Sequence, residues 1–98
     1  MTTEERFLAA WQKRLEQAEA LGVPVKRTRA LLERQEPLSA ARGILRRGSD
    51  EFGSLERLGR LDLSLEALVL APEFGPLFTD QEANACLDAL LEAGYYTR

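Results

Sequence analysis

The residues best suited to chemistry in this chain are charged, and they fall into two segments of opposite sign. Between residues 26 and 48 the basic side chains outnumber the acidic ones by five, and between residues 62 and 98 the acidic side chains outnumber the single basic one by six. The basic members of the first segment are Lys26, Arg27, Arg29, Arg34, Arg42, Arg46 and Arg47. This segregation indicates charged partners: a nucleic acid or an acidic protein for the first segment, a basic protein for the second.

Four carboxylates in the last third of the chain are candidates for contact with a basic partner. They are Asp80, Glu82, Asp88 and Glu92. Asp88 and Glu92 are four residues apart, so a helix presents both on one face. We expect this acidic face to bind a basic protein surface if the chain acts as a nucleic-acid mimic, or to complement the chain's own basic segment.

The segment just before these carboxylates is rich in Pro and Gly yet carries large apolar side chains, so the sequence predicts a loop over residues 71–78. Its apolar members are Phe74, Leu77 and Phe78. Such a loop either closes the core or presents an anchor to a partner. We favour the packing role, because short loops in small domains often close the core.

Catalytic chemistry has few candidates. The chain has no histidine, which removes the commonest general base and the commonest metal ligand. Its single cysteine, Cys86, falls on an apolar helical stripe, where a free cysteine packs as a small hydrophobe. The carboxylates lack the Glu-x-x-His spacing of a di-metal bundle, and no glycine-rich stretch continues as a phosphate loop. We therefore expect no enzyme, no catalytic residue, no metal and no cofactor.

The elements that position these residues are predicted to be helices. The strong helix formers Leu, Ala, Glu and Arg dominate, whereas the chain has only three valines and one isoleucine. Apolar residues recur at helical spacing, and no internal repeat is present. The sequence predicts an all-α fold, a compact bundle of five or six short-to-medium helices in one domain over residues 1–98.

Capping signals predict where the helices begin and end. Thr2 with Glu5 forms a capping box for a helix near residues 3–21, and Thr79 opens the last helix in the same way. The other expected helix starts are Pro24, Pro37, Ser49 and Ser64. The expected helix ends are Gly22, Gly48, Gly59 and Gly94.

Residues 60–66 allow two interpretations. Their apolar residues alternate with period two, as in a half-buried strand, which would make the fold α+β with one short strand. Ser64 followed by an apolar run is also typical of a capped short helix. We favour the helix, because no second segment alternates and a lone strand needs a partner.

The end of the first helix and the basic helix after it resemble a helix-turn-helix. Ala18, Gly22, Val23 and Leu31 occupy the small, turn and apolar positions of that motif, whereas Thr28 stands where Val or Ile is usual. The resemblance implies that DNA meets Lys26, Arg27, Arg29 and Arg34, with further phosphate contacts from Arg42, Arg46 and Arg47. The net charge of −3 argues against this, because free-standing DNA-binding domains are usually basic.

The favoured function is therefore a non-catalytic protein-interaction module: a small helical adaptor, regulator or inhibitor that binds another protein or a second copy of itself. The alternative is a helix-turn-helix-like DNA-binding regulator that uses the basic helix 24–36. The polar, acidic N-terminus lacks the pattern of a signal peptide, and no apolar stretch approaches the roughly 20 residues that span a bilayer. We expect a soluble, cytoplasmic protein without membrane contact.

Overall fold

The computed structural model describes residues 1–96, and within them the regular structure consists of helices without a β-strand. The α-helices are α1 (Thr3–Ala20), α2 (Lys26–Arg34), α3 (Pro37–Arg47), α4 (Phe52–Leu58), α5 (Leu65–Val69) and α6 (Asp80–Glu92), and the 3₁₀ helices are η1 (Leu61–Leu63) and η2 (Pro72–Leu77). The all-α prediction is confirmed.

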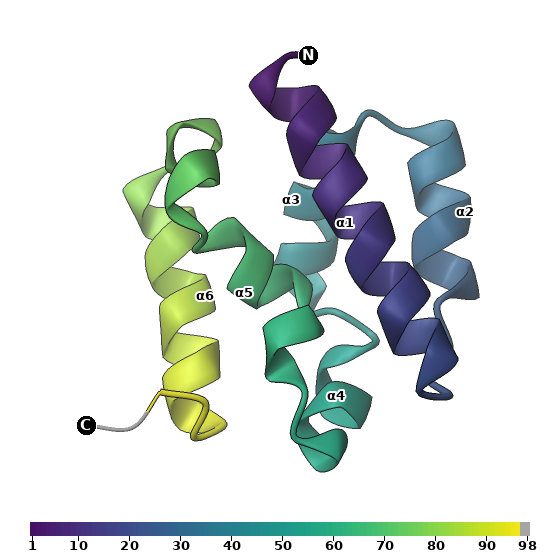
Figure 1. The fold of residues 1–98 in the computed structure, drawn as a ribbon. Coiled ribbons are helices and arrows are strands. Elements are labelled where there is room, and N and C mark those ends of the chain that lie inside the picture. Colours follow the sequence, from purple (N-terminus) through teal and green to yellow (C-terminus); the bar gives the residue numbers. More distant parts are fainter. Residues whose placement is uncertain (97–98) are drawn as a thin grey trace.

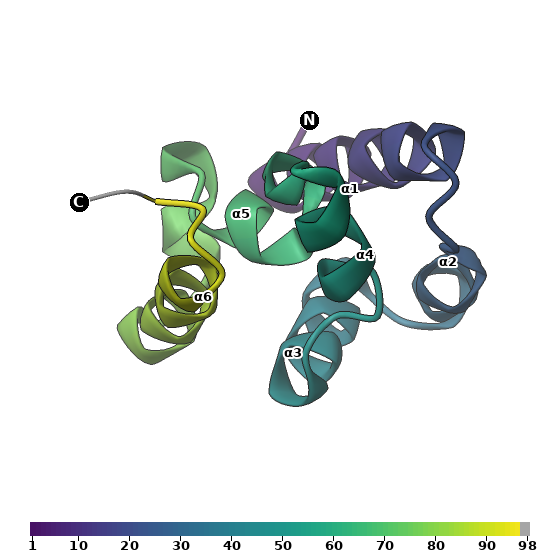
Figure 2. The ribbon, with the colours of Figure 1, turned by 90° about the horizontal axis from the view of Figure 1, so that it is seen from below.

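The other helices lie behind α1 and to either side of it (Figure 1). α1 packs against α3, α5 and both 3₁₀ helices, α2 packs against α3, and α6 packs against α5. Seen from below, α2 and α6 lie at opposite ends of the molecule, with α1, α3, α4 and α5 between them (Figure 2). The two segments of opposite charge, one on α2 and α3 and the other ending in α6, are therefore carried largely by different sides of the bundle.

One continuous apolar core joins these helices. Its centre is the stripe predicted along α1, which buries Phe7, Trp11, Leu15 and Ala18. Side chains spaced three and four residues apart share one face of a helix, so this stripe meets α3, α5 and both 3₁₀ helices from a single side. Cys86 is also buried in the core, as its place in the apolar pattern predicted.

Both predicted capping boxes are present. In α6 the Thr79 side chain accepts a hydrogen bond from the Glu82 N–H, and the Glu82 carboxylate accepts one from the Thr79 N–H. The same reciprocal pair opens α1 at Thr2 and Glu5. At the other end of α6, the N–H of Tyr95 donates to the carbonyl of Leu90 beyond Gly94, which is the expected Schellman ending.

Residues 60–66 form helical turns and not a strand. Leu61, Leu63 and Leu65 are all buried, because a 3₁₀ turn and the start of α5 bring alternate residues to the same side. The Ser64 side chain caps α5 by accepting a hydrogen bond from the Ala67 N–H. The favoured interpretation, a short helix opened by Ser64, is confirmed, and the α+β alternative is wrong for the described residues.

Three local predictions were wrong. Pro24 was placed in the first turn of the second helix, but α2 begins two residues later at Lys26. Ser49 was expected to cap the fourth helix, but α4 begins at Phe52 and Ser49 uses its hydroxyl elsewhere. The loop predicted at residues 71–78 is mostly the 3₁₀ helix η2. At Ser49 and in η2, contacts with distant parts of the chain decide the local structure: the Ser49 hydroxyl binds Glu66, and Phe74 packs against Phe7.

Candidate functional site

The α2–α3 hairpin carries most of the basic segment. The side chains of Val25, just before α2, and of Thr28 within it are buried in the core. Ala40, Ala41 and Ile44 are buried in the same way along α3. Pro37 opens α3 in its first turn, as predicted, and Gly48 ends it with a φ of +81°, a conformation that residues with a Cβ rarely adopt. The outer sides of the two helices are thereby left to the arginines.

A groove of about 180 Å³ runs between α2 and the C-terminal end of α3. We call it the arginine groove. Its charged lining consists of Arg27, Arg34 and Arg47 with one carboxylate, Asp50, and its apolar lining consists of Ala30, Leu31 and Ile44. Three guanidinium groups around an apolar surface can bind anionic groups through charge-assisted hydrogen bonds.

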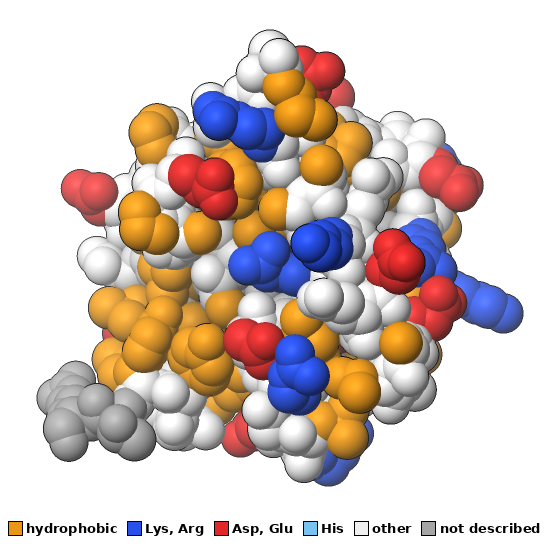
Figure 3. Space-filling model, viewed as in Figure 1, with side chains coloured by type: hydrophobic (Ala, Val, Ile, Leu, Met, Phe, Trp, Pro, Cys, Tyr) orange, Lys and Arg blue, Asp and Glu red, His pale blue; other side chains and the backbone are white. Residues whose placement is uncertain are grey.

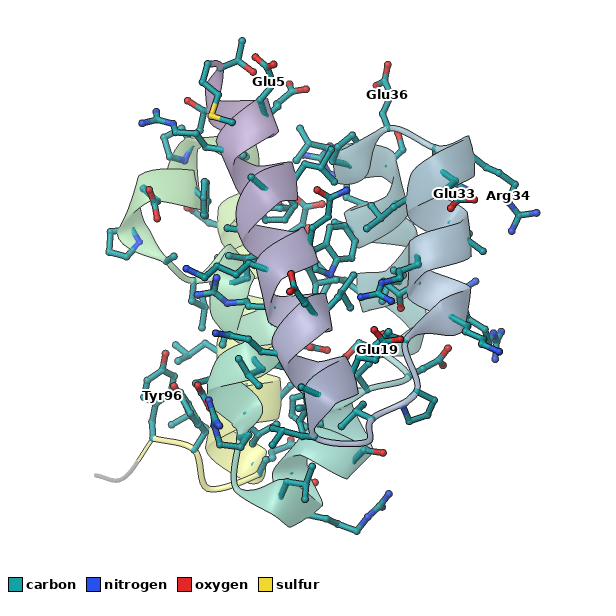
Figure 4. All side chains as sticks on the ribbon, turned by 45° about the vertical axis from the view of Figure 1, so that its right-hand side comes forward. Glu5, Glu19, Glu33, Arg34, Glu36 and Tyr96 are labelled. Carbon is teal, nitrogen blue, oxygen red and sulfur yellow. The ribbon has the colours of Figure 1, made fainter. Side chains whose placement is uncertain are left out.

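Two of the three arginines in the groove have no carboxylate partner among the described residues. Within residues 1–96 neither Arg34 nor Arg47 has a carboxylate at ion-pair distance. Arg27 lies 3.6 Å from Asp50 through its Nε, but both side chains are well exposed, so this pair contributes little. Figure 4 shows Arg34 extending from the end of α2 into solvent, near Glu33. The groove therefore offers guanidinium groups that the fold itself does not use.

Other members of the basic segment are used by the fold. Arg29 donates to Glu19 at 2.8 Å and connects α2 to the end of α1, where Figure 4 shows Glu19. Arg42 donates to the Glu82 carboxylate and to the Leu77 carbonyl, both at 2.8 Å, and so joins α3 to the start of α6. Both arginines have a carboxylate partner in the described chain, so the basic segment does not act as a single positive surface.

The two remaining basic residues lie outside the arginine groove. Lys26 lines a shallow hollow at the start of α2 together with Asp50 and Glu51. Arg46 lines a separate groove between α3 and α6 with Arg42. On the face seen in Figure 3, the basic side chains are interspersed with acidic ones, and apolar side chains gather over α5 and α6.

The three residues of the candidate apolar anchor differ in burial: one is fully buried and two are half-buried. Phe74 is buried, with its ring 5.3 Å from that of Phe7 in an edge-on arrangement. Phe78 packs against the same ring at 5.4 Å and, like Leu77, is half-buried against the core. The buried position of Phe74 supports the favoured packing role for this segment.

The candidate acidic face on α6 is mostly exposed. Asp80, Asp88 and Glu92 are open to solvent. Glu82 differs because it belongs to the capping box and to the Arg42 ion pair. Burial acts to raise its pKa, but the hydrogen bonds from the Thr79 N–H and the Arg42 guanidinium outweigh this and hold the pKa of Glu82 below its ordinary value.

Two buried carboxylates at the turn that follows α3 were not predicted from the sequence. Glu51 accepts a hydrogen bond from the Thr28 hydroxyl, and Glu66 accepts one from the Ser49 hydroxyl at 3.0 Å. Only 6% of Glu51 and 4% of Glu66 is exposed, and neither has a cationic partner among the described residues. One signal in the sequence indicates a buried acceptor such as Glu51: Thr28 lies on the inward face of its helix, where its hydroxyl needs a hydrogen-bond acceptor.

Burial raises the pKa of Glu51, and the nearby charges of Asp50 and Glu66 act in the same direction, against the hydrogen bond from Thr28. Glu51 thus resists ionisation in the folded chain. Because Thr28 lines the arginine groove and Glu51 immediately follows Asp50, this buried acid fixes the end of the groove at which α2 meets the 48–51 turn.

The potential metal ligands and the thiol of Cys86 are two further kinds of chemically reactive group in the described chain. Across residues 1–96, no three His, Cys, Asp or Glu side chains gather as they would around a metal ion. Burial, together with the charges of Glu66 and Glu82, raises the pKa of the Cys86 thiol to about 12, so it stays protonated and unreactive at neutral pH. None of the helices described is both long enough and apolar enough to cross a membrane.

Comparison of the chain with protein-family models, with curated proteins and with solved structures finds no match.

Proposed function

We propose that this protein is a non-catalytic helical interaction module that binds an acidic segment of a partner protein in the arginine groove. The observation that carries the proposal is the set of three arginines around an apolar surface, two of which have no carboxylate at ion-pair distance within residues 1–96. Arginine is enriched in protein interfaces, and its planar fork suits carboxylates. An adaptor, regulator or inhibitor would use such a groove. The single cysteine fits a cytoplasmic setting, which we propose for this interaction.

An acidic protein segment fits the charges better than duplex DNA does. DNA binding at useful affinity depends on neutralising many phosphates, and its strength falls steeply with salt. Here Arg29 and Arg42 are engaged by Glu19 and Glu82, so the number of cations available to a phosphate backbone is smaller than the sequence indicates. The net charge of −3 also repels a polyanion over the rest of the surface.

Fluorescence anisotropy tests the proposal with two labelled probes: a short peptide of mixed Asp, Glu, Leu and Ser, and a mixed-sequence DNA duplex. Arg34→Glu combined with Arg47→Glu should weaken peptide binding by about tenfold or more for each reversed arginine. Arg6→Glu with Lys13→Glu is the matched control, since both residues are exposed on α1, away from the groove, and the change in net charge is identical.

Peptide binding that both variant pairs weaken equally would contradict the proposal, since only the net charge would then matter. Binding of the duplex at about 50 mM salt that is lost at about 200 mM would favour the DNA-binding alternative instead. Sedimentation of the chain alone tests whether a second copy, through its exposed α6 carboxylates, is the acidic partner.

A further inference from the structure

The residues of α2 that line the arginine groove are spaced so that they share one face of the helix. Arg27 and Arg34 are seven residues apart, so they lie on the same face with a rise of about 10 Å between them. Ala30 and Leu31 lie between them on that face and, with Ile44 of α3, supply the apolar floor. Along α2 the lining therefore consists of a cation, an apolar patch and a second cation, in that order.

The charge at each end of this stripe is close to a single positive unit. Arg47 and Asp50 both line the groove, and Asp50 lies beside Arg27, so that end carries two guanidinium groups and one carboxylate. Arg34 stands alone at the opposite end, without a carboxylate at ion-pair distance in the described chain. Each end therefore matches one carboxylate of a partner.

We infer, resting on the function proposed above, that the arginine groove recognises an extended acidic segment in which two acidic residues flank an apolar one at alternate positions: acid, any residue, apolar residue, any residue, acid. In an extended chain alternate side chains point to the same side, so all three specified side chains face the groove. Four residues at about 3.3 Å each span about 13 Å, which guanidinium groups on flexible side chains can reach from positions about 10 Å apart.

Three labelled peptides of equal charge test this preference by anisotropy on the full chain. The first has the order Glu-Ser-Leu-Ser-Glu, the second replaces its leucine by serine, and the third has the order Glu-Ser-Leu-Glu-Ser, which turns one carboxylate away. The first peptide should bind about tenfold more tightly than the second, through loss of leucine burial. It should also bind about tenfold more tightly than the third, through loss of one charged contact.

A protein variant tests the same arrangement from the other side. Ala30→Glu places a negative charge at the centre of the groove, and the exposure of Ala30 together with the helix propensity of Glu preserves α2. Ala30→Glu should weaken binding of the first peptide by about tenfold or more. Ala9→Glu, at an exposed position of α1, should leave this affinity unchanged.

The outcomes separate this inference from the proposed function. Equal affinity for the three peptides, weakened by Arg34→Glu with Arg47→Glu, would overturn the spacing rule and leave the groove as a general acidic-segment site. Binding that neither the groove variants nor Ala30→Glu changes would overturn both. A preference for the first peptide that is lost in the Ala30→Glu variant would support both the spacing rule and the proposed function.

Discussion

At the scale of single residues, the hydroxyl of Thr28 and the carboxylate of Glu51 decide how α2 meets the 48–51 turn. Both groups are buried, and the hydrogen bond between them joins residues 23 positions apart. A buried carboxylate that loses its donor keeps the full cost of desolvation, which is larger than the net value of the bond itself. The pair therefore has more influence on stability than two exposed polar residues would have.

Thr28→Val should lower the free energy of unfolding by about 1–3 kcal/mol, because it keeps the shape of the side chain but leaves Glu51 without its donor. Thr28→Ser, which keeps the hydroxyl, should cost about 1 kcal/mol for the lost methyl group. Urea unfolding measures both. A valine variant as stable as the wild type would show that the hydrogen bond does not hold the turn.

The raised pKa of Glu51 also predicts how stability changes with pH. A carboxyl with a higher pKa in the folded than in the unfolded chain binds protons more tightly when folded, so stability should rise as the pH falls from 7 towards about 4.3. Glu82, whose pKa is lowered, acts in the opposite direction but only at lower pH.

Glu51→Gln should flatten this pH dependence, because the amide does not titrate in this range. Urea unfolding of wild type and variant at several pH values between about 5 and 7 measures the slope. Parallel curves for the two proteins would assign the pH dependence to another group.

At the scale of the helices, Arg42 joins α3 to the α6 side of the bundle. Its guanidinium binds both the Glu82 carboxylate and the Leu77 carbonyl, and the guanidinium carbon lies over the Phe78 ring, 5.7 Å from the ring centroid. About a third of its side chain is exposed, so solvent screening weakens the ion pair. The contact with the carbonyl adds a geometric constraint that a simple surface pair lacks.

Arg42→Met should lower the free energy of unfolding by about 1–2 kcal/mol, since the Leu77 carbonyl loses its donor and Glu82 loses its charge partner. Arg46→Met is the matched control one turn later on the same helix, where the side chain is exposed and has no ion pair among residues 1–96. Thermal unfolding followed by circular dichroism compares them, and equal losses would contradict a joining role for Arg42.

The helices were predictable from the sequence where their signals are local. The capping boxes at Thr2 and Thr79 and the glycine endings at Gly22 and Gly94 involve residues within one or two turns of each other. The role of Ser49 was not predictable, because its hydroxyl binds Glu66, 17 positions away. A serine before acidic residues is a cap signal in isolation, and only the tertiary fold redirects it.

The candidate site was predictable only in part for the same reason. The basic segment contains the arginines of the groove, but the sequence does not show which basic residues remain available to a partner. That depends on carboxylates that folding brings close, Glu19 to Arg29 and Glu82 to Arg42. The separations of 10 and 40 positions leave no periodic trace in the sequence. Of the arginines that have no such partner among residues 1–96, Arg34 and Arg47 line the arginine groove, whereas Arg46 lies outside it.

At the scale of the whole molecule, the arginine groove lies on the α2–α3 side and the exposed carboxylates of α6 lie at the other end (Figures 1 and 2). Such a distribution steers a charged partner towards one side of the molecule and away from the other. Association should therefore slow as salt is added, because exposed charges are screened beyond about 8 Å at physiological ionic strength.

The most direct test of the central claim is an NMR titration of the ¹⁵N-labelled chain with the acid–apolar–acid peptide. We expect the shifted amide signals to concentrate in residues 27–34 and 44–50, which flank the arginine groove. Arg34→Glu with Arg47→Glu should remove these shifts while the rest of the spectrum remains that of the folded chain. Shifts centred on α1 or α6, or shifts that survive the double reversal, would contradict the arginine groove as the binding site.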